Sequence, residues 1–332
     1  MTYSAALVAL LLLYCAACLA YVYRWRGRQR YGSLRQYLRK SWPVFAPLNC
    51  LLYMTTRRSA RAPVIDAGYL HGVCLLRANW QLIRREGLAL LANGDLDATC
   101  HEGSQGFHDL GFRTFYKRGW RKYYLTWYGT THRSAQRTCP ETLRLLARVP
   151  GVRGAMFSLL PPGAELTLHS DPLAGSLRYH LGLATPNDAR CFINIDGQAV
   201  AWRDGKDFVF DETYPHHARN DTQAMRLILM CDVVRPMNLL GRLANGGFTL
   251  LARAMRVPNT GEDTRGVLTW LFAVLSPWRQ AGLGLKRRHR KLYVLLKLLL
   301  NGSLLLSLLL GLYAMLEWFA ALGTVLEQVA AP

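Results

Sequence analysis

The sequence predicts a membrane-anchored α+β protein with a β-rich core, flanking helices and an apolar helix near each end. Three observations support this fold class. An almost uninterrupted apolar run occupies residues from about Ala5 to Tyr23, and a leucine-rich run begins at Leu292. Between Gly154 and Pro236, the chain has short runs rich in branched residues, and within these runs the hydrophobic pattern has a period of two residues. The chain has 332 residues, of which 51% are hydrophobic and 19% charged, so it can form one sizeable domain with accessory segments.

The first segment, residues 1–24, is predicted to be a transmembrane helix. Its apolar run is long enough to cross a bilayer, and Tyr21 and Tyr23 stand where interfacial aromatic residues are expected. The positive charges follow the run instead of preceding it, which argues against a cleavable signal peptide and places the rest of the chain in the cytoplasm. The 8 scattered cysteines fit this reducing compartment.

Residues 25–65 form a basic juxtamembrane segment. No acidic residue occurs in it, and the formal charge of the whole chain is +20. Aromatic and short apolar patches between the charges indicate a segment that lies on a membrane surface, although a solvated basic linker is an alternative. The charge suits phospholipid headgroups, a phosphorylated glycolipid or nucleic acid. Its basic residues near the apolar run are Arg24, Arg26, Arg28, Arg30, Arg35, Arg39 and Lys40.

Residues 66–236 are predicted to be the principal domain. Helical spacing of apolar residues covers 75–83, a loop-rich stretch follows, and Glu141 to Val149 reads as another helix. Basic and aromatic residues alternate irregularly over 115–128. They could form a surface for phosphates and acyl chains or for stacked bases, or they could be an ordinary strand whose aromatic residues enter the core.

The β-rich part, residues 154–236, is predicted to be a jelly-roll core. Its short strands and closely spaced turn signals are typical of an all-β sandwich or barrel. Asp196-Gly197 separates two such runs, which predicts a tight hairpin.

After Pro236 the pattern becomes helical again. Residues 237–291 are predicted to be a helical interfacial segment, in which Gly266 to Trp278 is apolar but too short for a full span. A basic cluster at 286–291 precedes a second predicted transmembrane helix at 292–320. Both spans therefore place the middle of the chain in the cytoplasm.

A candidate metal site lies within the jelly-roll core. His169 and Asp171 share one face of a strand by their i, i+2 spacing, and His216 arrives from a later strand. Two histidines and a carboxylate can occupy one face of an octahedral Fe(II) ion and leave three positions open. A satisfied histidine followed by a turn-forming aspartate is the alternative reading. Three further residues could compete as ligands, namely Asp211, Glu212 and His217.

Two arginines, Arg178 and Arg226, occur in otherwise apolar strands. Such a residue usually has a specific anionic partner, and its planar guanidinium suits a carboxylate. A dicarboxylate co-substrate beside the metal would need this kind of group. The alternative is a structural ion pair with Asp196, Asp211 or Asp232.

These motifs, in this order, resemble the aspartyl/asparaginyl β-hydroxylase family of Fe(II)- and 2-oxoglutarate-dependent dioxygenases, and most of all its bacterial lipid A-modifying branch. The resemblance covers roughly Ser158 to Pro236 and implies a double-stranded β-helix, which is the jelly roll of these enzymes. It implies that His169 and His216 bind iron. Asp171 completes a facial triad, as in the lipid A branch, whereas the animal peptide hydroxylases lack a carboxylate there.

The resemblance also implies roles in binding the co-substrate. Arg226 would receive the distal carboxylate of 2-oxoglutarate, with Ser158 as a helping hydroxyl. Arg178 and His180 would lie near the metal-chelating end.

The implied activity is C2 hydroxylation of a lipid A acyl chain at the cytoplasmic face of a bacterial inner membrane, with Fe(II) as cofactor and 2-oxoglutarate and O₂ as co-substrates. We expect lipid A or a related anionic lipid as the partner, and no nucleic acid. Two other functions stay open. The protein could hydroxylate Asp or Asn residues of a protein, or it could be a membrane-anchored module that binds without catalysis.

Overall fold

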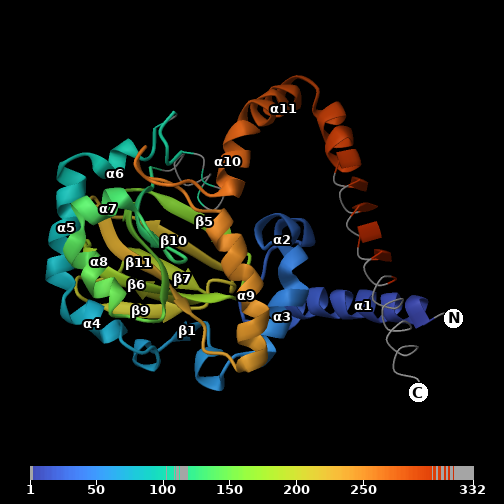
Figure 1. Cartoon of the computed structure of the whole chain (residues 1–332), viewed down its shortest axis with the longest axis horizontal. Helices are drawn as coiled ribbons and strands as arrows, with labels where there is room; N and C mark the ends of the chain where they lie inside the picture. The colour runs from blue at the N-terminus through green and yellow to red at the C-terminus, as the bar shows by residue number, and fades with distance from the viewer. Residues whose placement is uncertain are drawn as a thin grey trace, which may run out of the picture. The chain divides into compact units, whose positions relative to one another are not determined.

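The computed structural model describes residues 3–300, except 102, 108, 110–111 and 113–118, together with scattered residues between 302 and 317. The chain divides into two compact units. The larger unit, Cys15–Phe272, contains both β-sheets (Figure 1). The smaller unit combines Met1–Tyr14 with Ala273–Pro332.

Two antiparallel sheets form the core of the larger unit. The larger sheet has seven strands in the order β1-β9-β6-β11-β4-β2-β3, and the smaller has four in the order β5-β10-β7-β8. The strands of the larger sheet are β1 Val64–Ile65, β9 Asp207–Phe210, β6 Ser176–Ala184, β11 Arg226–Val234, β4 Val152–Leu160, β2 Arg121–Trp127 and β3 Thr130–Thr131. Those of the smaller sheet are β5 Glu165–His169, β10 His216–Asn220, β7 Cys191–Ile195 and β8 Gln198–Ala201.

This arrangement is the predicted jelly roll, since consecutive strands pass between two facing sheets. The sheet extends beyond the predicted core, because β2 pairs with β4 along most of its length. The aromatic stretch that contains β2 is therefore a strand at 121–127, and Tyr123 and Tyr124 are buried. The predicted hairpin joins β7 to β8, and its turn residues Asp196 and Gly197 both have positive φ, as a type I′ turn requires.

Helices cover the outer face of the larger sheet. Helix α5 (Trp80–Ala92) buries Ile83, Gly87 and Leu90, which lie on one face at helical spacing. Gly87 is needed there, because a Cβ atom would lie 3.0 Å from the Phe157 ring and 3.2 Å from Leu227. The other helices on the same side of the chain's core are α4 Val73–Ala78, α6 Asp95–Ala98, α7 Arg133–Thr138 and α8 Pro140–Ala147, together with the short 3-10 turn η4 Ala67–Tyr69.

The segment that follows the first apolar helix differs from the prediction of a surface-lying stretch. It comprises the π-helical turn η1 Tyr21–Trp25, α2 Leu34–Lys40, η2 Pro43–Phe45, α3 Ala46–Thr55 and η3 Arg58–Ala60. Much of it packs against the β-core, with Arg26, Tyr31 and Leu52 buried. The reason is that Arg26 finds an anion in the core, a 2.8 Å salt bridge to Asp211.

Apolar helices lie near both ends of the described chain. Helix α1 (Tyr3–Ala20) continues into η1, and the stretch Ala6–Trp25 is long and apolar enough to cross a membrane. Three more helices follow the core, namely α9 Leu239–Ala254, α10 Val267–Val274 and α11 Ser276–Arg288. Residues 290–300 are helical, as are the described residues between 302 and 317, but the rest of the second predicted span, 292–320, lies outside the described residues and the span stays a prediction.

Candidate metal centre and co-substrate site

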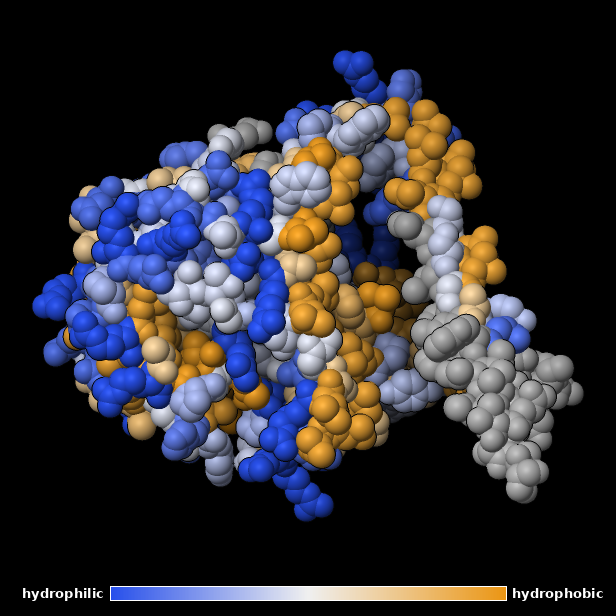
Figure 2. Space-filling view, viewed as in Figure 1, coloured by the Kyte–Doolittle hydropathy of each residue, from blue (hydrophilic) through white to orange (hydrophobic). Residues whose placement is uncertain are grey.

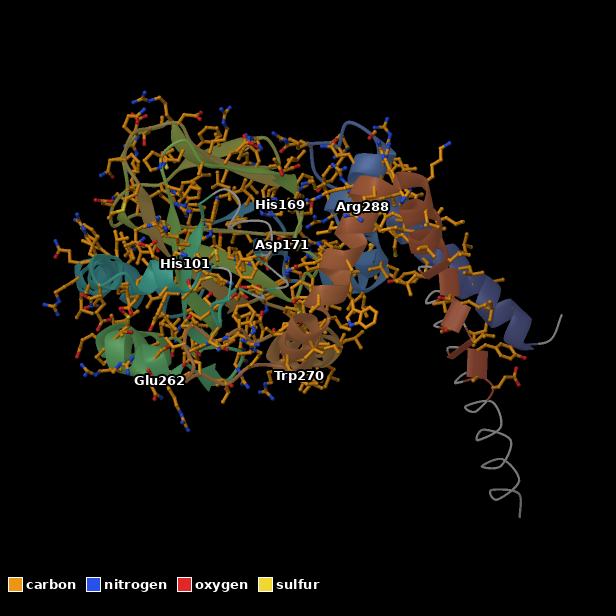
Figure 3. All side chains as sticks on the ribbon, turned by 90° about the horizontal axis from the view of Figure 1, so that it is seen from above. His101, His169, Asp171, Glu262, Trp270 and Arg288 are labelled. Carbon is orange, nitrogen blue, oxygen red and sulfur yellow. The ribbon has the colours of Figure 1, made fainter. Side chains whose placement is uncertain are left out.

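The structure brings His169, Asp171 and His216 together. His169 ends β5 and His216 begins β10, and the two are partners in the antiparallel pairing of these strands. Their ring centroids are 4.2 Å apart. One potential ligand atom from each of the three residues lies within 4.8 Å of the others. His169 and Asp171, marked in Figure 3, are half-buried and His216 is buried, so the site opens on the aspartate side.

Hydrogen bonds orient both imidazoles. Nδ1–H of His169 donates to the carbonyl of Thr167, and Nδ1–H of His216 donates to the carbonyl of Tyr214, each at 2.9 Å. With Nδ1 engaged in this way, Nε2 is the atom of each ring that can bind a metal, a common arrangement around metal-binding histidines. Burial lowers the pKa of His169 to about 4 and the pKa of His216 well below its usual range. Both rings are therefore neutral at neutral pH, as metal ligands must be.

The three competing ligand candidates are engaged elsewhere. Asp211 forms salt bridges with Arg26 and Arg235. Glu212 contacts Arg178 and accepts a hydrogen bond from the Ser176 hydroxyl at 3.0 Å. His217 follows His216 along β10, so its side chain projects from the opposite face of the smaller sheet.

Arg178 lies among three carboxylates. Its guanidinium is 3.2 Å from Asp171, 3.1 Å from Asp232 and in contact with Glu212. The ion pair with Asp232 is one of the structural alternatives that the sequence left open. Burial raises the pKa of Glu212 to about 8 and that of Asp232 to about 6, even though Arg178 opposes both shifts. Arg178 contacts Oδ2 of Asp171, whereas Nε2 of His169 lies 3.6 Å from Oδ1, so the ion pair holds the carboxylate through the oxygen that does not face His169.

Among the residues that the structure describes, Arg226 has no such partner. Its side chain is fully buried, and none of its three guanidinium nitrogens has a hydrogen-bond partner. The guanidinium lies between two tryptophan rings, 5.0 Å from the centroid of Trp120 and 4.4 Å from that of Trp202. Burial lowers its pKa to about 9. No ion pair joins Arg226 to Asp196, Asp211 or Asp232, the partners considered from the sequence. Burying an unpaired guanidinium costs free energy of folding, and this is expected where the guanidinium binds an anionic ligand.

His180 and Ser158 project into the same interior. Nε1–H of Trp202 donates to Nδ1 of His180 at 3.3 Å, so Nε2 carries the hydrogen. Nε2 has no hydrogen-bond partner in the described part of the chain. Ser158 is paired with Ile228 in the β4–β11 ladder, where Leu160 is paired with Arg226. Its buried hydroxyl therefore lies on the same sheet face as Arg226, one diagonal step away. The interior of the barrel therefore contains one guanidinium, of Arg226, and two hydrogen-bond donors, of His180 and Ser158. These groups could bind a dicarboxylate.

Sequence reasoning missed two parts of this site. Trp120 and Trp202 both contact the guanidinium of Arg226. Trp120 belongs to the aromatic stretch 115–128, but nothing in the sequence linked either tryptophan to Arg226. The second part is the set of hydrogen bonds that hold the loop after β5, residues 170–174, which carries Asp171 and is called the ligand loop below. Asn49 of α3 donates to the Pro172 carbonyl at 2.9 Å and accepts from the Ala174 amide at 2.8 Å.

Two more bonds from the N-terminal segment reach the residue between the ligands. The Ser170 amide donates to the Lys40 carbonyl at 3.0 Å, and the Tyr31 hydroxyl lies 2.7 Å from Ser170 Oγ. The ligand loop is thus held by residues that the sequence assigned to a membrane surface.

A jelly roll that carries two histidines and a carboxylate on one face, with an unpaired cation deeper in the barrel, is the arrangement of the non-haem iron oxygenases. The chain is also similar in sequence to hydroxylases. Residues 77–236, just under half of the chain, match the model of the Aspartyl/Asparaginyl beta-hydroxylase family, which is the family that the sequence motifs resemble.

Two relatives show how far the similarity extends. The ornithine lipid ester-linked acyl 2-hydroxylase of Rhizobium tropici is 36% identical over 135 residues, which are 40% of this chain and 48% of that protein. The human aspartyl/asparaginyl beta-hydroxylase is 31% identical over 176 residues, 52% of this chain and 22% of that protein. The chain thus spans less than half the length of either relative. A solved Pseudomonas putida prolyl-4-hydroxylase aligns over 48% of this chain and 88% of its own, at 16% identity and a TM-score of 0.32.

Proposed function

We propose that this protein is an Fe(II)- and 2-oxoglutarate-dependent dioxygenase that hydroxylates C2 of an acyl chain in an anionic membrane lipid, with lipid A as the substrate. The observation that carries the catalytic part is the buried, unpaired guanidinium of Arg226 behind the triad of His169, Asp171 and His216. A metal-binding triad alone would fit many enzymes, but the buried guanidinium of Arg226 requires an anion as well.

The residues have distinct tasks in this proposal. His169, Asp171 and His216 hold the metal on one face. Arg226 pairs with the distal carboxylate of 2-oxoglutarate, as the planar fork of an arginine favours. The Nε2–H of His180 donates to the co-substrate nearer the metal.

The surroundings keep this chemistry in order. The rings of Trp120 and Trp202 exclude water from the Arg226 pair, which strengthens it. Arg178 holds Asp171, so the third ligand does not rotate away. When bound, Fe(II) with O₂ supplies the oxidising power that converts a C–H bond to C–OH while 2-oxoglutarate becomes succinate and CO₂.

Several features support a lipid substrate. One relative is named as an acyl 2-hydroxylase of a lipid. The stretch Ala6–Trp25 can anchor the chain in a bilayer. Helix α9 exposes four leucines, Leu239, Leu240, Leu243 and Leu250, and Figure 2 shows hydrophobic residues along it. An amphipathic helix with an exposed leucine face suits the membrane interface.

The charge of the chain supports an anionic headgroup and a location at the cytoplasmic face of a bacterial inner membrane. Most basic residues just after the apolar stretch are solvent-accessible, among them Arg24, Arg28, Arg35 and Arg39. They would meet lipid phosphates and, by the positive-inside rule, would lie on the cytoplasmic side, where Fe(II) and 2-oxoglutarate are available.

Two other substrates deserve a place in the test. Ornithine lipid is favoured by the name of the Rhizobium tropici relative, and a protein side chain by that of the human relative. We would compare lipid A, ornithine lipids and membrane proteins by mass spectrometry in cells with and without the gene. A gene-dependent gain of one oxygen on an acyl chain of lipid A is the expected result. Unchanged lipid A with a modified ornithine lipid or protein would reject lipid A as the substrate.

A biochemical test addresses the cofactors directly. Purified full-length protein with Fe(II), 2-oxoglutarate and O₂ should form succinate in proportion to the hydroxylated lipid. If no succinate forms under any substrate condition, a non-catalytic binding module becomes the better description.

A further inference from the structure

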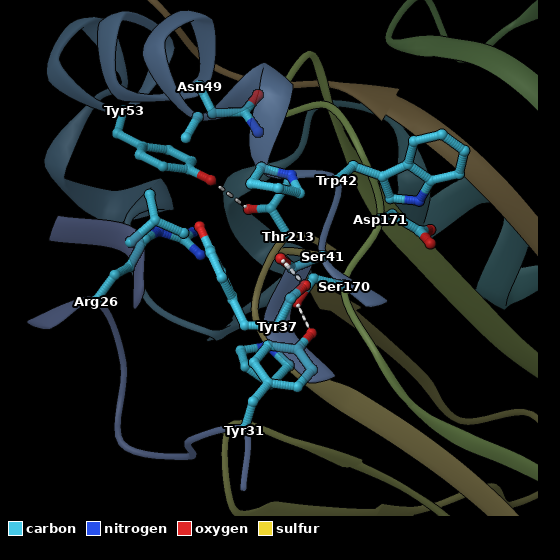
Figure 4. A pocket seen from close by; sticks show the side chains of 14 residues that line it. Arg26, Tyr31, Tyr37, Ser41, Trp42, Asn49, Tyr53, Ser170, Asp171 and Thr213 are labelled. Atoms are coloured by element: carbon cyan, nitrogen blue, oxygen red, sulfur yellow. Dashed lines mark hydrogen bonds between the residues drawn. The ribbon is translucent and has the colours of Figure 1, made fainter. Parts of the chain in front are cut away.

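One pocket in the larger unit connects the candidate membrane span to the metal site. Its lining includes Val22, which belongs to the apolar stretch Ala6–Trp25, and Asp171, which belongs to the triad. Figure 4 shows the pocket from close by, between the N-terminal segment and the loops that carry Ser170 and Thr213. A single cavity therefore touches both the lipid anchor and a metal ligand.

The walls of this pocket offer little charge to a ligand. Nine of its fourteen lining residues have polar side chains, but of these only Arg26 and Asp171 carry charge. The hydroxyls of Tyr31 and Tyr53 are already engaged with Ser170 and Thr213. The charge of Arg26 is already neutralised by its buried salt bridge to Asp211, and its guanidinium is covered by the rings of Tyr53 and Tyr214, at 4.0 and 3.6 Å. The charge of Asp171 would be met by the metal. No charged group on the wall is therefore left for a peptide carboxylate to pair with.

Trp42 lines the pocket and has a strained backbone. It adopts φ of 52°, a left-handed conformation that is rare for a bulky residue. About half of its side chain is exposed, although it lines the same pocket as Asp171. Strained backbone of this kind persists where the surrounding structure fixes it, and it often occurs at ligand-binding sites. Here the 3-10 turn Pro43–Phe45 after Trp42 and the Ser170–Lys40 bond before it fix the backbone.

We propose that this pocket admits the acyl chain of a membrane lipid from the side of the anchor helix, and that Trp42 is the wall that selects for an apolar chain. The proposal rests on the proposed hydroxylation of a lipid. It assigns ten of the fourteen lining residues, those between 22 and 53, to a segment outside the region that matches the family. Substrate specificity would then reside in the segment that leads out of the membrane.

Photolabelling tests the location of the acyl chain without relying on turnover. The full chain would be reconstituted in vesicles of phosphatidylethanolamine and phosphatidylglycerol containing a trace of phosphatidylglycerol with a diazirine on its acyl chain. After irradiation, peptide mass spectrometry should find the label on pocket residues such as Trp42 and Pro43. Label confined to the anchor helix or to α9 would overturn the proposal.

Kinetics of Trp42 variants provide the second test. Trp42→Ala should raise KM for the lipid on the order of tenfold, the size expected for losing apolar contact with a methylene or two. Trp42→Phe should restore most of it. Fe(II) affinity and KM for 2-oxoglutarate should stay unchanged in both variants. Tyr69→Ala, which removes an exposed aromatic outside the pocket, is the matched control.

The two tests separate this inference from the proposed function. If the wild type hydroxylates lipid but Trp42→Ala has unchanged KM and the label falls elsewhere, the entry site is wrong while the function stands. If no lipid is hydroxylated but the pocket is labelled, the entry site stands while the proposed reaction fails.

Discussion

Replacing Arg226 by methionine should stabilise the protein in the absence of 2-oxoglutarate and abolish its response to 2-oxoglutarate. Methionine has a similar length and no charge. Burial lowers the pKa of Arg226 to about 9, so at neutral pH the unpaired charge costs about 5 kcal/mol relative to the unfolded chain. The cation–π contacts with Trp120 and Trp202 stabilise the folded state by roughly 2 to 3 kcal/mol and offset part of this cost. The net gain for Arg226→Met is therefore about 2 kcal/mol, or roughly 4 to 8 °C in Tm for a domain of this size.

The assay is thermal unfolding of the full chain in detergent, with Mn(II) in place of Fe(II) and with or without 2-oxoglutarate. At a hundredfold excess over Kd, the co-substrate should stabilise the wild type by about 2.7 kcal/mol. Arg226→Met should show no such shift. Arg148→Met, which changes an exposed arginine, serves as the control and should behave like the wild type in both conditions.

Two results would refute this reasoning. A lower Tm for Arg226→Met without co-substrate would mean that the guanidinium is structurally satisfied. A retained 2-oxoglutarate shift in the variant would mean that another group receives the distal carboxylate.

Three further predictions concern the ligands and the loops that hold them. His169→Ala and His216→Ala should each abolish succinate formation while the far-UV circular dichroism and Tm change little; activity in either variant would contradict the ligand assignment. Asn49→Ala removes two hydrogen bonds to the ligand loop and should weaken Mn(II) binding about tenfold in a calorimetric titration; unchanged affinity would show that the loop holds itself. Burial alone would raise the pKa of Asp211, but Arg235 and Arg26 hold it well below its usual range. Its contribution to stability is therefore complete above about pH 4 and is lost as the pH falls further, so urea unfolding of Asp211→Asn should show a flatter acid limb than the wild type.

The triad could be predicted from the sequence because its information is local. Side chains alternate along a strand, so His169 and Asp171 lie on one face. A histidine that begins a later strand of a jelly roll can face the same interior, which made His216 the expected third ligand. The hairpin at Asp196-Gly197 was predictable for the same reason, since the two residues alone determine the turn.

The surroundings of the triad could not be predicted, because they depend on contacts between distant segments. Nothing near Arg226 in sequence distinguishes an arginine that lacks a partner from Arg178, which has three; both occur in apolar strands. The basic segment after the span posed a related problem. It was predicted to lie on the membrane surface, but Arg26 pairs with Asp211 in the core. The backbone carbonyl of Lys40 and the side chain of Asn49 hold the loop that carries Asp171 through hydrogen bonds.

The junction between Trp25 and Arg26 has a consequence for the proposed reaction. The candidate span ends at Trp25, and the next residue is already fixed in the core by its salt bridge. Residues 15–25 of the span also belong to the same compact unit as the two sheets. If these residues lie in a bilayer, the proposed metal site would lie close to the membrane surface. The depth that an acyl chain must reach would then help to select the carbon that is hydroxylated, in addition to contacts in the pocket.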